Sequence, residues 1–126
     1  MTASRAVLTV KGVGGRVDWS PDGRLFVTEG PEESGLIDLR DPRTGRSIRT
    51  FRADAVDINM ARFSADGSLL ASAGDDGTMK VWDVGTGERL LDLPGTGEVW
   101  APAFGPDRTT VAGVWFDGEP VVRVWD

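Results

Sequence analysis

Residues 63–83, read as FSADG at 63–67, LLASAG at 69–74, DDGT at 75–78 and KVWD at 80–83, decide the fold. Ala61 and Phe63 alternate with the charged Arg62, as side chains do on a half-buried strand. The apolar run from Leu69 to Ala73 is typical of a strand that is covered on both faces. Asp76-Gly77 is a hairpin signal, because glycine adopts the positive φ that tight turns require. This stretch therefore predicts successive antiparallel strands joined by short turns.

Two landmarks of this stretch recur along the chain, an aromatic residue followed by a polar turn and a Val-Trp-Asp triplet, and a Thr-Gly pair just after the stretch is a third. They share a period of about 42 residues, which is typical of repeats that each form four strands. The copies are WSPDG at 19–23, FSADG at 63–67 and FGPDR at 104–108; LRD at 39–41 and VWD at 81–83 and 124–126; and Thr-Gly at 44–45 and 86–87.

The same pattern predicts an all-β chain, since no segment has convincing helical periodicity. The expected strands are residues 7–10, 17–20, 25–29 and 35–40, then 47–51, 58–63, 69–73 and 78–82, then 89–93, 99–104, 110–115 and 121–125.

These landmarks resemble those of the WD-repeat family over nearly the whole chain. The resemblance implies three four-stranded antiparallel propeller blades, at about residues 12–52, 53–94 and 95–126, with an N-terminal outer strand at 6–11. Members of the family usually carry a Gly-His pair before the innermost strand. The corresponding positions here are Gly12-Val13, Ala53-Asp54 and Pro94-Gly95, and the chain has no His. We therefore expect stability to come from apolar packing between blades and from the strand ladders.

Composition narrows the possible functions. The chain has 126 residues, a net charge of −6 and no Cys, which argues against nonspecific binding to nucleic acid and excludes thiolate chemistry. The absence of His removes the commonest general base and metal ligand. Met1–Val10 does not read as a signal peptide, and no stretch approaches the ~20 apolar residues of a membrane span. The expectation is a cytoplasmic protein with no cofactor, no metal and no membrane or nucleic-acid partner.

The number of blades raises the question of closure, because propellers usually close at about 4–8 blades. We expect the ring to be completed by head-to-tail self-association, in which an N-terminal strand extends the third blade of a neighbouring chain. Two chains would form six blades, which is favoured over three chains and nine blades. The alternatives are a fragment of a larger propeller and a structural assembly unit without its own ligand. The predicted assembly residues are Val7, Leu8, Val10, Val122, Val124 and Trp125.

The resemblance places the innermost strands near a central channel, where a partner could bind. Trp100 falls early in such a strand, where its counterparts are Asn59 and Gly15. It is either a binding anchor or a filler of the ring. Further candidate binding residues, with solvated charges at strand ends as the alternative, are Arg16, Asp57 and Arg62.

The sequence contains few features that are typical of an active site. Asp75-Asp76 reads as the start of a hairpin, and no nucleophile elbow, phosphate loop or calcium loop is present. We therefore expect no catalytic residues and a protein–protein interaction or assembly module. An enzyme acting on a small molecule or glycan in the ring pocket is a remote alternative.

Overall fold

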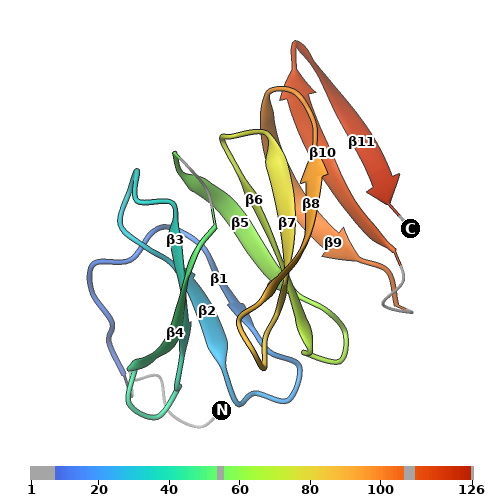
Figure 1. Ribbon diagram of the computed structural model, residues 1–126. Helices are drawn as coiled ribbons and strands as arrows, with labels where there is room; N and C mark the ends of the chain where they lie inside the picture. Colours follow the sequence, from blue (N-terminus) through green and yellow to red (C-terminus); the bar gives the residue numbers. More distant parts are fainter. Residues whose placement is uncertain (1–7, 54–55, 107–109, 126) are drawn as a thin grey trace, which may run out of the picture.

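The computed structural model describes residues 8–53, 56–106 and 110–125, and every regular element in that part of the chain is a β-strand (Figure 1). The strands are β1 Val17–Trp19, β2 Phe26–Glu29, β3 Leu36–Arg40, β4 Ser47–Arg52, β5 Ile58–Phe63, β6 Leu69–Gly74, β7 Thr78–Asp83, β8 Arg89–Pro94, β9 Glu98–Phe104, β10 Val111–Asp117 and β11 Glu119–Trp125.

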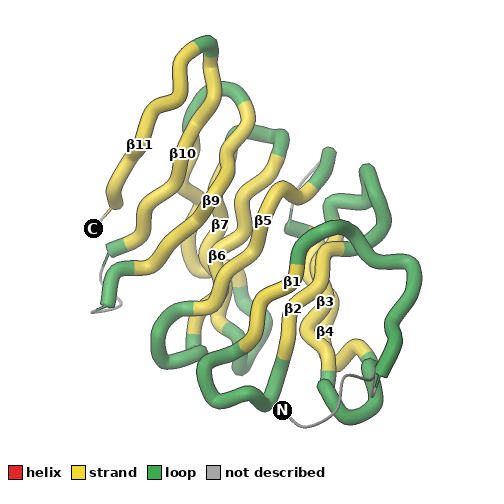
Figure 2. The backbone as a smooth tube through the Cα atoms, turned by 180° about the vertical axis from the view of Figure 1, so that it is seen from behind, coloured by secondary structure: helices red, strands yellow, loops and turns green. Residues whose placement is uncertain are grey.

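The strands form three antiparallel sheets that stand beside one another (Figures 1 and 2). The first sheet has the order β1-β2-β3-β4, and the second has the order β5-β6-β7-β8. The third contains β9, β10 and β11, the three strands expected from this part of the chain, and its fourth strand was expected to come from a neighbouring chain. β5 packs against the first sheet, and β9 packs against β5 and β6 of the second. The all-β antiparallel prediction is confirmed.

The N-terminal segment departs from the sequence prediction. Residues 8–10 form no strand, and Val7 lies outside the described residues. The side chains of Leu8 and Val10 instead lie against Gly45, in the turn between β3 and β4. β4 already fills the outer position of the first sheet, and residues 8–10 pair with no described strand of the same chain. The pairing of this segment with the third sheet of a neighbouring chain stays a prediction.

The core lies between the sheets, and β6 and β7 contribute to both of its halves. Leu70 and Trp82 face the first sheet, while Ala71, Met79 and Val81 face the third. Successive side chains of a strand point to opposite faces, so a sheet packed on both sides needs apolar residues at consecutive positions. This explains the continuous apolar run from Leu69 to Ala73.

The recurring aromatic landmark ends in a turn that its own side chains hold. Ser20 Oγ donates a hydrogen bond to Asp22 Oδ1 (2.8 Å) and accepts one from Leu25 N (3.0 Å). In the second copy Ser64 Oγ donates in the same way to Asp66 Oδ1 (2.9 Å). These local bonds replace ladder bonds where the chain reverses, which is why serine and aspartate recur there.

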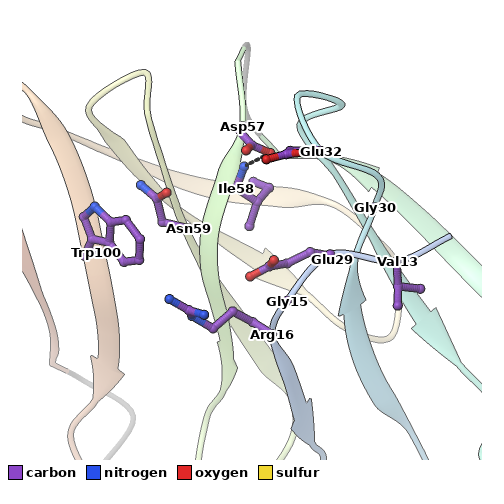
Figure 3. A pocket seen from close by; sticks show the side chains of 11 residues that line it. Val13, Gly15, Arg16, Glu29, Gly30, Glu32, Asp57, Ile58, Asn59 and Trp100 are labelled. Carbon is purple, nitrogen blue, oxygen red and sulfur yellow. Dashed lines mark hydrogen bonds between the residues drawn. The ribbon is translucent and has the colours of Figure 1, made fainter. Parts of the chain in front are cut away.

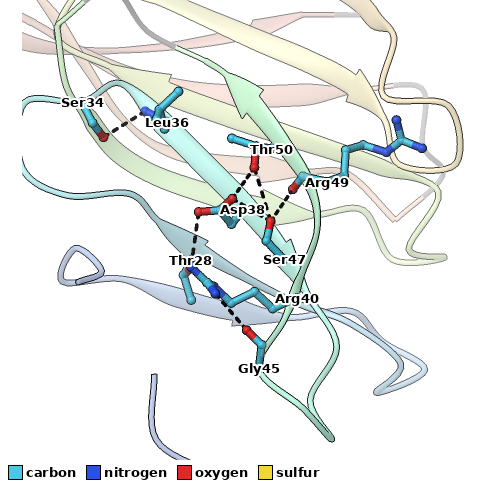
Figure 4. A network of polar contacts seen from close by, with 9 residues as sticks. All are labelled: Thr28, Ser34, Leu36, Asp38, Arg40, Gly45, Ser47, Arg49 and Thr50. Atoms are coloured by element: carbon cyan, nitrogen blue, oxygen red, sulfur yellow. Dashed lines mark hydrogen bonds and ion pairs between the residues drawn. The ribbon is translucent and has the colours of Figure 1, made fainter. Parts of the chain in front are cut away.

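The face of the first sheet that points away from the second sheet carries a polar network (Figure 4). Arg40 Nε donates to Thr28 Oγ1 (2.9 Å), and Arg40 Nη1 donates to the Gly45 carbonyl (2.8 Å). Ser47 Oγ donates to Asp38 Oδ1 at 2.8 Å. Because these groups satisfy one another, this face presents few unpaired polar atoms.

Candidate binding site

A cavity of about 470 Å³ opens where the inner strands of the three sheets meet (Figure 3). The segment before β1, the end of β2, the start of β5 and the start of β9 each contribute to it. Its lining residues are Val13, Gly14, Gly15, Arg16, Glu29, Gly30, Glu32, Asp57, Ile58, Asn59 and Trp100.

The structure brings three of the four predicted binding residues into this cavity. Trp100, Arg16 and Asp57 all line it, although they are far apart in the sequence. Arg62 does not, and lines a separate cavity of about 340 Å³ with Phe63 and β9. Arg62 lies further along β5 than the cavity, with its Nε 3.3 Å from Met60 Sδ. The binding roles of these four residues stay predictions.

Glu29 is the residue at this site that sequence reasoning missed. It ends β2, its exposed fraction is 9%, and its Oε1 has no hydrogen-bond partner among the described residues. Burial raises the pKa of Glu29, and the charge of Arg16 acts in the opposite direction. The corresponding position of the second repeat is Ala73, which is buried in the core. A carboxylate at a position that is apolar in another repeat is the signal that could have found it.

The segment before β1 runs directly against this carboxylate. A Cβ atom at Gly14 would lie 2.6 Å from Glu29 Oε2, so only glycine fits there. Gly14 N also donates a hydrogen bond to the Glu29 carbonyl (3.0 Å). The glycine-rich sequence before β1 therefore allows close approach of the backbone to Glu29.

Trp100 forms the opposite wall and holds a cation over its ring. Arg16 Cζ lies 5.5 Å from the centre of the Trp100 ring, within cation–π range. Trp100 Nε1 donates to Glu98 Oε2 at 3.2 Å. The pairing of β9 with β10 shifts register here, and Ala101 has a φ of 54°. Such bulges change the direction of neighbouring side chains.

Asn59, the repeat counterpart of Trp100, has a structural role. It lies where the pairing of β5 with β6 also shifts register. Its Nδ2 donates to Asp75 Oδ1 (2.8 Å) and to the Val99 carbonyl (3.0 Å). The amide therefore ties the second sheet to β9 at the floor of the cavity.

The charge of the cavity is negative. Glu29, Glu32 and Asp57 contribute three carboxylates, and Arg16 contributes one guanidinium. No group of acidic residues in the described part of the chain is arranged to hold a metal ion. The arrangement is suited to binding a cation or a hydrogen-bond donor.

Comparisons with known proteins bear on the family. Residues 45–83 match the family model described as WD domain, G-beta repeat. The chain is 37% identical over 73 residues to WD repeat-containing protein 1 of Xenopus tropicalis, covering 55% of this chain and 12% of that protein. The chain belongs to the WD-repeat family. The three sheets of this WD-repeat chain are accordingly called its blades.

Two other proteins are also similar to this chain. The Small ribosomal subunit protein RACK1 of Caenorhabditis elegans is 35% identical over 69 residues, covering 55% of this chain and 20% of that protein. The Periodic tryptophan protein 2 homolog of Schizosaccharomyces pombe is 30% identical over 100 residues, covering 79% of this chain and 12% of that protein. The WD-repeat chain thus spans a fifth or less of the length of these relatives. The described part of the chain contains no helix that is long and apolar enough to cross a bilayer.

A second surface of the WD-repeat chain lies on the third blade, away from the second. Val122 and Val124 of β11 are each 67% exposed there. They pair with Val114 and Ala112 of β10, so these four residues share one face. We call this set (Ala112, Val114, Val122 and Val124) the open face of the third blade. An apolar hollow of about 360 Å³ beside it is lined by Glu98, Trp100, Ala101, Val114 and Phe116.

The predicted assembly residues are not brought together within one chain. Val122, Val124 and Trp125 lie on β11, at one end of the stack of blades, whereas Leu8 and Val10 lie beside the first blade (Figure 1). The Trp125 side chain turns inward and packs against the core cluster between the second and third blades.

Proposed function

We propose that this WD-repeat chain is a protein-binding module that associates head-to-tail with further copies of itself. The observation that carries the proposal is the open face of the third blade. Val124 pairs with Ala112 as Val81 pairs with Ala71 in the second blade, so the two valines occupy equivalent positions. Val81 is 2% exposed because the third blade covers it, whereas Val124 is 67% exposed. Covering a valine contributes about 1.5–3 kcal/mol.

The first blade of a second copy is a suitable cover for this face. Each blade inside the stack packs its first strand against the preceding blade, as Ala61 and Phe63 of β5 do. Their repeat counterparts in β1 are Val17 and Trp19, which are 63% and 54% exposed. The two ends of the chain therefore carry the two halves of the internal interface. The polar network around Arg40 on the first blade is already hydrogen-bonded, so covering it leaves few groups unpaired.

Such an interface is heterologous and closes only if the rotation per copy completes a circle. Two copies form six blades, within the usual range of propellers, and are favoured over three copies and nine blades. β11 pairs only with β10 among the described strands. Residues 7–10 of the next copy are proposed to extend its edge, with Val7, Leu8 and Val10 contributing to the contact. We further propose a cytoplasmic, non-enzymatic protein.

The relatives support an assembly role. RACK1 is named as a small ribosomal subunit protein. We propose the same class of role, as a part of a larger assembly, for the present chain.

The test is the solution mass by light scattering coupled to size exclusion, for the full chain and for Val124→Asp. We expect twice the 13.5 kDa of the chain, and we expect Val124→Asp to return the mass to a single chain. The matched control is Leu90→Asp, which places the same charge at an exposed position of the second blade and keeps the dimer. Deletion of residues 1–10 tests strand exchange separately and should weaken the dimer. A folded wild-type monomer, or a dimer indifferent to Val124→Asp, would overturn the proposal.

A further inference from the structure

We propose that the cavity between Glu29 and Trp100 receives an arginine side chain from an extended segment of a partner protein. The inference deepens the proposed function and rests on its protein-binding part, because it assigns the chemistry of the partner. It does not depend on self-association.

The first argument is the single unpartnered oxygen of the buried Glu29 carboxylate. Glu29 is nine-tenths buried, faces the cavity in Figure 3, and leaves Oε1 without a hydrogen-bond partner among the described residues. A buried acceptor without a donor is costly, and a ligand that supplies the donor recovers that cost. With Glu32 and Asp57 also lining the cavity and only Arg16 opposing them, the ligand group that fits is a cation.

The second argument is the aromatic wall. Arg16 Cζ stands 5.5 Å from the centre of the Trp100 ring, so the chain itself already stacks a guanidinium on this surface. The Arg16 side chain is solvent-exposed and precedes β1 instead of being packed in a sheet. An incoming guanidinium can take this place while Arg16 moves outward. Arginine is favoured over lysine because its planar group stacks on aromatic rings and donates several hydrogen bonds at once.

The third argument is access. The lining includes Gly14, Gly15 and Gly30, which present backbone in place of side chains. A Cβ atom at Gly15 would meet nothing within 4 Å, so this side of the cavity is open. A volume of about 470 Å³ accommodates a side chain with its adjoining backbone and is too small for a folded element.

The test follows the indole N–H signal of Trp100 by two-dimensional ¹H–¹⁵N NMR of the full chain. Trp100→Phe assigns that signal. The probes are acetyl-Gly-Arg-Gly-amide and the same peptide with citrulline, which keeps the shape of arginine without its charge. We expect the arginine peptide to shift the Trp100 signal in a saturable way, and the citrulline peptide to bind about tenfold more weakly because charge-assisted hydrogen bonds are lost.

Variants locate the interaction. Glu29→Gln should weaken the arginine peptide about tenfold, since it replaces the carboxylate with a neutral group of the same shape. Glu119→Gln removes a charge at an exposed position of β11 and should leave binding unchanged. Arg16→Gln should strengthen binding about threefold, because the competing guanidinium leaves the Trp100 ring.

The outcomes separate this inference from the proposed function. Equal binding of the arginine and citrulline peptides, unaltered binding by Glu29→Gln, or no shift of the Trp100 signal would overturn the arginine site. A dimer by light scattering that binds no arginine peptide would leave self-association standing. A monomer that binds the peptide through Glu29 would support the site and reject self-association.

Discussion

The second and third blades present the same apolar pattern on the same face, but only one of them is covered. Val81 of the second blade and Val124 of the third are equivalent in their strand pairing, with exposed fractions of 2% and 67%. Met79 and Val122 differ in the same way, at 0% and 67%. The strand pattern therefore determines which side chains lie on a face, whereas burial depends on what stands next to it.

The largest expected effect comes from placing a charge at these two equivalent positions. Val81→Asp should lower the free energy of unfolding by more than about 3 kcal/mol, because it buries an unpaired carboxylate between two blades. Val124→Asp should change it by less than about 0.5 kcal/mol in dilute, monomeric protein, since the position is at the surface. Urea unfolding followed by circular dichroism measures both. Similar losses for the two variants would show that the open face is covered within the single chain.

The recurring Val-Trp-Asp triplet offers a second comparison, between Trp82 and Trp125. Trp82 Nε1 donates to Ser72 Oγ at 3.0 Å, and the Trp82 ring stacks on Phe51 with 5.0 Å between centroids. Trp125 Nε1 is buried without a partner among the described residues. The repeat counterpart of Ser72 is Gly113, which has no hydroxyl, and a Cβ atom there would lie in tight contact with the Trp115 ring at 3.0 Å.

We therefore expect Trp82→Phe to be more destabilising than Trp125→Phe, by about 1 kcal/mol. The first variant loses a buried hydrogen bond and leaves Ser72 Oγ unpaired, whereas the second removes a donor that has nothing to bind. Thermal unfolding of the two variants side by side measures the difference. Equal losses would mean that Trp125 Nε1 is satisfied, for example by a neighbouring copy.

A smaller effect on the free energy of unfolding is expected at β4, the outer strand of the first blade. Arg49 of β4 donates to the carbonyls of Thr86 (2.9 Å) and Gly85 (3.2 Å), and so ties the first blade to the second. The equivalent position of β8 is Leu91, which is 52% exposed. Arg49→Ala should cost about 1 kcal/mol through the lost hydrogen bonds. Arg52→Ala, at an exposed position of the same strand, is the matched control. A loss of stability at Arg52 as large as at Arg49 would contradict a stabilising contact between Arg49 and the second blade.

The smallest expected effect is the pH dependence that Glu29 introduces. Burial raises the pKa of Glu29 above its ordinary value of 4.5, so the folded chain binds this proton more tightly than the unfolded chain. The unfavourable contribution is therefore complete above the raised pKa and disappears as the pH falls below 4.5. Glu29→Gln should raise the melting temperature near neutral pH, by an amount corresponding to about 1 kcal/mol or less.

That advantage over the wild-type chain should vanish in acid. Glu119→Gln, at an exposed position, should show no such pH-dependent difference. A Glu29→Gln advantage that persists unchanged well below pH 4.5 would contradict the role of burial.

Most of the strand framework could be predicted from the sequence. The strand at 58–63 has the expected limits, and the strand that starts at Leu69 ends one residue later than expected. Alternation and turn residues are local properties, so they identify strands and hairpins without knowledge of neighbours. The segment at 8–10 forms no strand in the single chain, because apolar residues form a strand only where a partner strand pairs with them.

The cavity was predictable in part. Trp100, Arg16 and Asp57 were predicted from their places on or beside the innermost strands, and the structure gathers them in one cavity. Arg62 lies on β5, which begins directly after Asp57, but it lines a different cavity. Glu29 was missed because its burial and its unpartnered oxygen result from the approach of the glycine segment around Gly14. That approach joins parts of the chain whose proximity no local pattern encodes.

By itself, the sequence determined the all-β character, the period of the repeat and the membership of the WD-repeat family, because these depend on residue order within about 42 residues. The tertiary structure alone decided which apolar faces are covered, which carboxylate oxygen is left without a hydrogen-bond partner and which charge stands over Trp100. The physical reason is that side-chain direction follows from the strand, whereas burial and electrostatics depend on the distance to segments from other blades.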